Sequence, residues 1–96
     1  MKKGNNLFAR MDYRNDEIKW DEQIIQRHLE WAKKLASERF FIGGGMESGP
    51  PCCLFEAKDI SEAEEIINKD PLITNGLYRY ELHQWHMVVF SENIFE

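Results

Sequence analysis

The sequence contains no hydrophobic run approaching the roughly 20 apolar residues that a membrane crossing requires. The short apolar run that follows Lys2 and Lys3 ends at Arg10, which makes it too short for the core of a signal peptide. Positive charge is also scarce: the formal net charge of -5 disfavours a nucleic-acid backbone as partner. We therefore expect a cytoplasmic protein that binds neither a membrane nor a nucleic acid.

Cysteine is rare, and its spacing gives no indication of a metal site. Cys52 and Cys53 are adjacent, neighbouring residues of a strand point to opposite faces, and no C-x-x-C pair is present. His83 and His86 lie three residues apart, so on a strand they also face opposite sides and do not form a metal site together with His28. We expect no metal and no cofactor.

Gly43-Gly44-Gly45 is the most glycine-rich part of the chain. No Lys-Ser/Thr pair and no helix start follow it, so it does not resemble a phosphate-binding loop. We interpret it as a strand end where backbones approach closely or the chain turns. A second interpretation stays open, because three glycines also leave room for a ligand.

Residues 1–96, with 43% hydrophobic and 12% aromatic residues, are expected to form a single globular domain. In the first strand, Leu7, Ala9, Met11 and Tyr13 alternate with Phe8, Arg10 and Asp12. The pattern predicts four strands: residues 7–13, residues 40 into the glycines, residues 52–57, and a strand that starts near residue 77 and passes residue 85, with an extension to residue 90 left open. It also predicts two helices: one starts near Asp21, and the other starts at a capping box over Ser61–Glu64 and ends at about Lys69.

The element order β-α-β-β-α-β predicts an α+β fold with an antiparallel sheet and both helices on one of its faces, as in ferredoxin-like proteins. The second and third strands carry apolar residues on both faces, for example Phe40 and Phe41. A large exposed apolar face usually marks an interface. We therefore expect a homodimer that packs sheet against sheet, with the segment 86–96 as a C-terminal extension contributing to it.

His28 and Asp70 are the candidate site residues. His28 is the one polar residue on the apolar stripe of the first helix, and Asp70 precedes Pro71, which ends the second helix. At a helix C-terminus the dipole disfavours a carboxylate, so we expect Asp70 to have a raised pKa or to hold a histidine. Antiparallel helices would bring both residues to one cleft, where general acid/base chemistry is possible. The alternative is a buried histidine with satisfied hydrogen bonds beside an ordinary helix stop.

Several short segments, in this order, resemble the YciI-like (YCII-related) family: His28-Leu29, Phe55-Glu56-Ala57, Ser61-Glu62-Ala63, Asp70-Pro71, Gly76-Leu77 and Trp85. The resemblance implies a ferredoxin-like dimeric α/β barrel, and it implies an active-site histidine and aspartate that match His28 and Asp70. The chain departs from the family pattern at Glu38-Arg39, at the three glycines and in the tail after Trp85.

Two hypotheses of function follow. In the first, the protein is a cofactor-independent lyase or isomerase that acts on a small polar or cyclic metabolite, with His28 as general acid or base and Asp70 as its orienting partner. In the second, it is a non-catalytic dimeric module for ligand binding or an accessory role, and the pair only satisfies a buried polar cluster.

Overall fold

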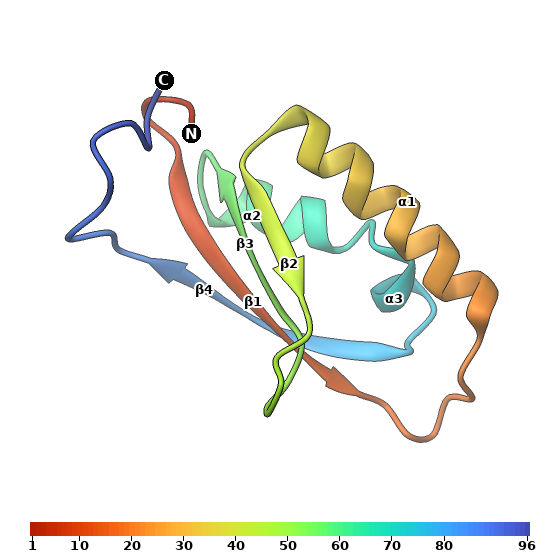
Figure 1. Cartoon of the computed structure of the whole chain (residues 1–96). Helices are drawn as coiled ribbons and strands as arrows, with labels where there is room; N and C mark the ends of the chain where they lie inside the picture. The colour runs from red at the N-terminus through yellow and green to blue at the C-terminus, as the bar shows by residue number, and fades with distance from the viewer.

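The computed structural model describes all 96 residues, and four strands and three helices succeed one another along the chain (Figure 1). Their bounds are β1 Asn6–Arg14, α1 Glu22–Glu38, β2 Phe41–Gly44, β3 Cys52–Ala57, α2 Ile60–Ile67, α3 Pro71–Thr74 and β4 Tyr78–Trp85. None of the helices has the length and apolar character that crossing a membrane requires.

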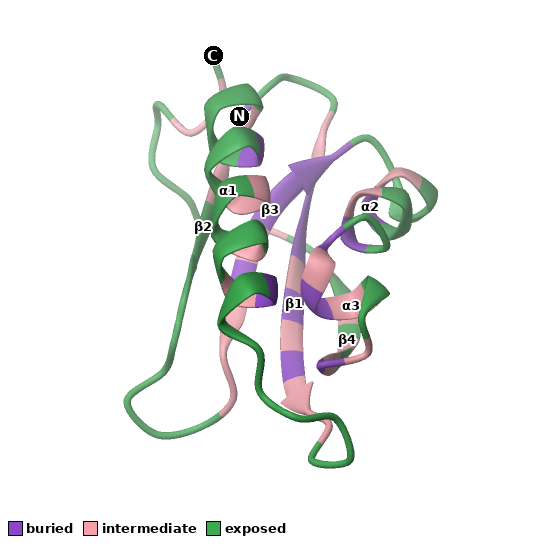
Figure 2. Cartoon of the chain, turned by 90° about the vertical axis from the view of Figure 1, so that its right-hand side faces the viewer, coloured by how far each residue is buried: buried purple, intermediate pink, exposed green.

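The strands form one sheet in the order β2-β3-β1-β4, and every neighbouring pair is antiparallel. All three helices lie on the same side of this sheet, as Figures 1 and 2 show. This arrangement confirms the predicted ferredoxin-like α+β fold. The helix α3 is an addition to the predicted set of elements.

The second helix begins earlier than predicted. Its N-cap is Asp59 rather than Ser61: the Asp59 carboxylate accepts the amide N–H of Glu62 at 2.9 Å. The Glu62 side chain in turn accepts the N–H of Lys58 at 3.2 Å. Asp59 and Glu62 therefore cap this helix, two residues before the predicted pair of Ser61 and Glu64.

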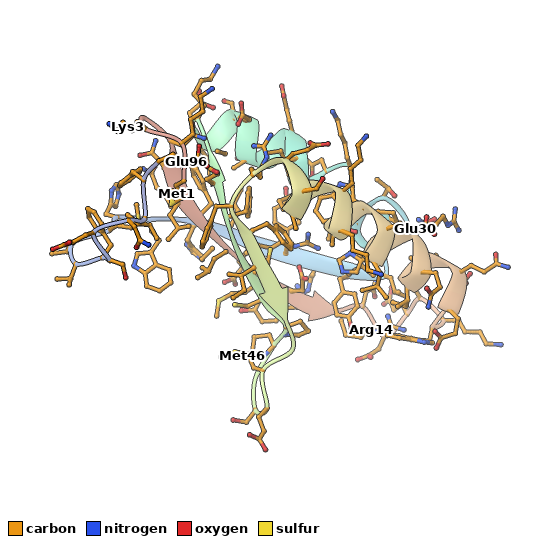
Figure 3. All side chains as sticks on the ribbon, turned by 45° about the horizontal axis from the view of Figure 1, so that its top comes forward. Met1, Lys3, Arg14, Glu30, Met46 and Glu96 are labelled. Atoms are coloured by element: carbon orange, nitrogen blue, oxygen red, sulfur yellow. The ribbon has the colours of Figure 1, made fainter.

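The last strand ends at Trp85 and does not extend to residue 90. Trp85 pairs with Leu7, close to the start of β1 at Asn6, so β1 offers almost no backbone for further pairing. The tail then leaves the sheet and returns to the N-terminus. There the amide of Glu96 donates to the carbonyl of Met1 at 2.9 Å, and Figure 3 shows these two residues close together.

Asp70 lies at the start of a helix, and not at the end of one as predicted. The helix α2 ends at Ile67 with Asn68 as its C-cap, and Asp70 is the N-cap of α3, with Pro71 at the first position. Its carboxylate accepts the N–H of Leu72 at 2.9 Å. A helix start is favourable for a negative charge, so the predicted dipole conflict does not exist.

The main core lies between the sheet and the helices. It is formed by buried residues of both layers: Phe8, Cys53, Phe55, Ala57, Ala63 and Ile67. The helices cover the side of β1 that carries Phe8, Arg10 and Asp12, all of them buried. A charged pair therefore lies inside the molecule, next to the apolar core.

The opposite face of the sheet carries no helix (Figure 1). Register places Leu7, Ile42, Leu54 and Trp85 on it, and the side chains of Ile42 and Trp85 are 60% and 53% exposed. This face, on which the exposed apolar side chains lie beside the polar residues His83 and Glu81, is left open in the single chain.

Candidate functional site

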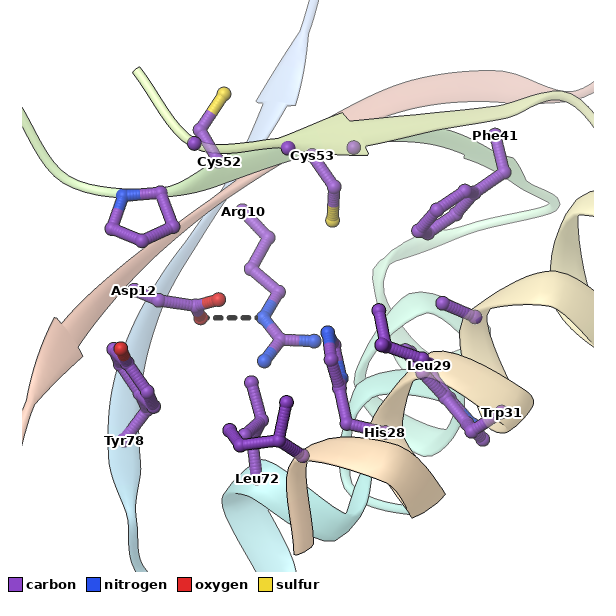
Figure 4. Close-up of a pocket in the computed structure, with 16 residues that line it drawn as sticks. Arg10, Asp12, His28, Leu29, Trp31, Phe41, Cys52, Cys53, Leu72 and Tyr78 are labelled. Atoms are coloured by element: carbon purple, nitrogen blue, oxygen red, sulfur yellow. Dashed lines mark hydrogen bonds and ion pairs between the residues drawn. The ribbon is translucent and has the colours of Figure 1, made fainter. Parts of the chain in front are cut away.

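A cavity of about 290 Å³ lies between α1 and the sheet (Figure 4). Its lining comes from β1, α1, β2, β3 and the start of α3, and comprises Arg10, Asp12, Ile25, His28, Leu29, Trp31, Ala32, Phe41, Gly43, Gly44, Gly45, Pro51, Cys52, Cys53, Leu72 and Tyr78. Most of these side chains are apolar, and the charged side chains Arg10 and Asp12 lie together with His28 at one end. Such a mixture is typical of sites for small molecules.

The structure brings His28 and Asp70 into contact. The Nδ1 atom of His28 lies 2.8 Å from Oδ1 of Asp70. Asp70 is fully buried, whereas the histidine side chain is 23% exposed and lines the cavity. The second ring nitrogen, Nε2, makes no hydrogen bond within the chain. Within this pair, Asp70 is shielded from solvent, whereas His28 is accessible from the cavity.

Asp70 is held by three partners. Besides His28 and the N–H of Leu72, it accepts a hydrogen bond from Nη1 of Arg10 at 2.6 Å. Burial alone would raise the pKa of this carboxyl, but the hydrogen bond from His28 and the charge of Arg10 outweigh burial and lower the pKa. The expectation of a raised pKa is therefore wrong, and the expectation that Asp70 holds a histidine is met. Since an ionised carboxylate only accepts, Nδ1 of His28 carries the hydrogen in this bond.

Arg10 is the site residue that sequence reasoning missed. It is only 1% exposed and is sandwiched between the rings of Trp31 and Tyr80, each centroid 6.0 Å from its guanidinium carbon. Its Nε donates to Oδ1 of Asp12 at 2.6 Å, drawn as the dashed line in Figure 4. Its Nη2 has no partner in the chain. Although burial lowers the pKa of Arg10, the two carboxylates outweigh burial and raise it.

Asp12 is the second carboxylate on this arginine. It is 8% exposed and lines the cavity, and Oδ1 is the only one of its carboxylate oxygens that forms a hydrogen bond. Burial raises the pKa of Asp12 more than Arg10 lowers it. The spacing Arg10-x-Asp12 places both side chains on one face of a strand, which is the signal by which the sequence could have indicated an ion pair.

The glycines form part of the opposite wall. At Gly43, a Cβ atom would lie 3.0 Å from Cβ of Cys53 and 3.3 Å from the ring of Phe41, so this position needs a glycine for the close approach of β2 and β3. All three glycines also line the cavity, as the ligand interpretation requires. Burial raises the pKa of the neighbouring Cys53 thiol to about 12, so this thiol stays protonated at neutral pH and is a poor nucleophile.

The other histidines lie apart from this cavity. His83 is on the open face of the sheet, 3.5 Å from Glu81, and His86 follows the end of β4. No three histidine, cysteine or acidic side chains are grouped in a way that could hold a metal ion.

Comparison with known proteins identifies the family. No curated protein matches the sequence. The fold is similar to that of 5-chloro-2-hydroxyhydroquinone dehydrochlorinase from Burkholderia phenoliruptrix, solved with 2,5-dihydroxybenzoquinone: TM-score 0.62, 16% identity, 83% of this chain and 93% of that chain covered. A designed protein, Foldit4, matches less well, with TM-score 0.49, 13% identity and coverage of 88% and 98%. The YCII-related domain matches residues 7–86, and the chain therefore belongs to the YCII-related family.

Proposed function

We propose that this protein is a small cofactor-independent lyase or isomerase, in which His28 moves a proton at Nε2 and Asp70 orients the imidazole. One observation carries the proposal: His28 is bonded through Nδ1 to a fully buried carboxylate, while its ring lines a cavity of about 290 Å³. A histidine that only filled the core would have no such open side.

The pair has the chemistry that proton transfer needs. Because Nδ1 donates to Asp70, Nε2 is the ring atom that exchanges a proton with a substrate: it takes one when the ring is neutral and gives one when the ring is an imidazolium. The negative charge of Asp70 stabilises the imidazolium. A positioned acid or base of this kind typically accelerates a reaction by about 10² to 10⁴ fold.

The cavity suggests a compact, largely apolar substrate with polar substituents. Trp31 and Phe41 meet edge to face, with ring centroids 6.4 Å apart, and form an apolar wall. The polar groups are confined to the end beside Arg10. The enzyme with the similar structure acts, according to its name, on a chlorinated hydroxyhydroquinone, and its structure was solved with a dihydroxybenzoquinone. These two compounds are therefore the first to test, together with small cyclic ketones and lactones.

We further propose that the chain works as a homodimer. The open sheet face carries exposed Ile42 and Trp85, and the tail beyond β4 adds Val88 and Val89, which are 87% and 92% exposed. A second copy packed against this face would remove these side chains from water. The segment 86–96 would then take part in the interface.

The test compares the wild-type protein with His28→Gln and with the control Lys33→Gln, which changes an exposed residue of the same helix outside the cavity. Two readouts are chloride release from 5-chloro-2-hydroxyhydroquinone and exchange of ring C–H for C–D in 2,5-dihydroxybenzoquinone, followed by proton NMR. We expect His28→Gln to lose at least about a hundredfold in rate while its circular dichroism is unchanged. Full activity of His28→Gln, or no turnover by the wild type across the whole compound panel, would contradict the proposal.

The second candidate is a non-catalytic module, and one observation favours it: each of Arg10, Asp12, Asp70 and His28 has at least one hydrogen-bond partner within the cluster. In that case, His28→Gln lowers stability, and neither the wild type nor the variant turns over any compound. The same experiment therefore separates the two candidates.

A further inference from the structure

Two carboxylates bind one arginine at the end of the cavity, and they differ in burial, in hydrogen bonding and in access to the cavity. Asp70 is fully buried, accepts hydrogen bonds on both oxygens and is not part of the cavity lining. Asp12 bonds through Oδ1 only, and it lines the cavity. A carboxylate needed only to neutralise Arg10 would gain by using both of its oxygens, as Asp70 does. The second oxygen of Asp12 is therefore available to a ligand.

The position of Asp12 is opposite that of His28. Figure 4 shows Asp12 on the sheet side, His28 on the helix side and the guanidinium of Arg10 between them. Arg10 joins the two halves of the site, since it donates to Asp12 and to Asp70 at 2.6 Å each. A small molecule at this end of the cavity would thus meet two titratable groups, Asp12 on the sheet and His28 on the helix.

We propose that Asp12 is a second catalytic residue, which takes the substrate proton at its unpaired Oδ2, on the sheet side of the polar end, while His28 donates a proton from the helix side. The inference rests on the proposed function and deepens it: the substrate must carry an acidic O–H or C–H and, across the ring or double bond, a group that leaves or accepts a proton. Arg10 is a positioning residue, because it holds both carboxylates.

The proton balance of an elimination can be written from these two groups. Oδ2 of Asp12 takes a proton from an O–H or C–H of the substrate, and the electron pair of that bond forms a new π bond. The bond to the leaving group breaks, and the leaving group departs with its electron pair: a basic group such as hydroxide takes a proton from Nε2 of the His28 imidazolium, whereas chloride departs as the anion. In the first case a proton passes from Asp12 to His28 through water, and in the second case Asp12 releases its proton to water, so that both residues return to their starting states.

The surroundings of Asp12 suit a base. The charged or titratable groups that face it are Arg10 on its own strand, Cys53 on β3, His28 on α1 and Asp70 before α3. Burial raises the pKa of Asp12 while Arg10 and His28 oppose the rise. Environments that push the pKa values of two nearby carboxyls apart are typical of sites in which the two have different tasks.

The experiment measures the pH–rate profile of both assays named above for the wild type, Asp12→Asn, Asp12→Glu and His28→Gln. The control is Glu64→Gln, which removes an exposed carboxylate of α2 that does not line the cavity. We expect Asp12→Asn to lose at least about a hundredfold in kcat together with the acid limb of the profile. We expect Asp12→Glu to recover part of the rate with a shifted acid limb, and Glu64→Gln to behave as the wild type.

Each other outcome has a definite meaning. If His28→Gln is inactive but Asp12→Asn stays within threefold of the wild type and keeps the acid limb, the role of Asp12 is overturned and the proposed function stands. If the wild type turns over no compound of the panel, the proposed function fails and the role of Asp12 fails with it. Should Asp12→Asn not fold, Asp12→Glu decides, because an unchanged acid limb in that variant also overturns the proposal.

Discussion

At the scale of single residues, the site is a set of buried charges that depend on one another. Arg10 is 1% exposed and pairs with Asp12 and Asp70, and Asp70 also pairs with His28. Taking a charge out of water costs several kcal/mol unless partners compensate for it. Removal of one member therefore leaves the others in an unfavourable state, and the loss of stability should exceed that of an exposed pair.

We predict that Asp70→Asn lowers the free energy of unfolding by about 3 kcal/mol, because it leaves Arg10 with a single carboxylate in a buried site. Urea unfolding followed by circular dichroism measures the loss. Asp59→Asn, at the exposed N-cap of α2, is the matched control and should lose much less. Equal losses in the two variants would show that the buried ion pairs have little effect on stability.

The two carboxylates should also have opposite effects on acid stability. The folded-state pKa of Asp70 lies below 3.8, so its stabilising contribution is complete above pH 3.8 and is lost as the pH falls below that value. The pKa of Asp12 is raised, so its contribution is complete below 3.8 and is lost as the pH rises through the folded-state value. We predict that Asp70→Asn flattens the fall of unfolding free energy between about pH 4 and 2. Urea titrations at a series of pH values test this, and an unchanged slope would refute it.

At the scale of elements, two short segments determine the shape of the site. The helix α3 spans only Pro71–Thr74, yet it gives Asp70 a helix start to cap and so fixes the carboxylate beside His28. The strand β2 contributes Gly43, which pairs with Cys53 of β3 and lines the cavity. A side chain at that position would push the two strands apart.

We predict that Gly43→Ala lowers the free energy of unfolding by about 2 kcal/mol, because the added methyl group would lie 3.0 Å from Cβ of Cys53. Gly44→Ala is the control, since nothing lies within 4 Å of a Cβ at that position. It should be neutral or slightly stabilising in the same urea experiment. A loss in Gly44→Ala as large as that in Gly43→Ala would mean that strand flexibility, and not close approach, requires these glycines.

At the scale of the whole molecule, the two faces of the sheet have different surroundings. Helices cover one face and enclose the cavity with it, whereas the other face, with exposed Ile42 and Trp85, is uncovered in the single chain (Figures 1 and 2). The proposed homodimer is the economical way to cover it. This proposal concerns the assembly and is independent of the chemistry at His28.

We predict a mass in solution of twice the 11.4 kDa of the chain, measured by light scattering coupled to size-exclusion chromatography. Ile42→Glu should shift the protein to the monomer, because Ile42 lies on the open face and is 60% exposed. Ile60→Glu, which alters an isoleucine of α2 that is 42% exposed, should leave the dimer intact. A monomeric wild type, or dissociation in both variants, would speak against the sheet face as the interface.

Much of the fold could be predicted because its signals are local. Alternation defined β1, and the helix predicted from Asp21 is α1, which Asp21 caps. The end of β4 depended on where its partner β1 begins, which no local pattern reveals. The position of His28 on the apolar stripe was equally readable from helical spacing, and so the histidine was found.

By itself, the sequence determined the order of the four strands and the two longer helices and singled out His28 and Asp70, because helical and strand periodicity and proline are local effects; it did not reveal α3. Only the tertiary structure decided which side of β1 the helices cover, since alternation separates two faces without saying which is inside. That choice buries Arg10 and Asp12 and adds them to the site. It also reversed the expected pKa shift of Asp70, because His28 and Arg10 approach this carboxylate from parts of the chain 42 and 60 residues away.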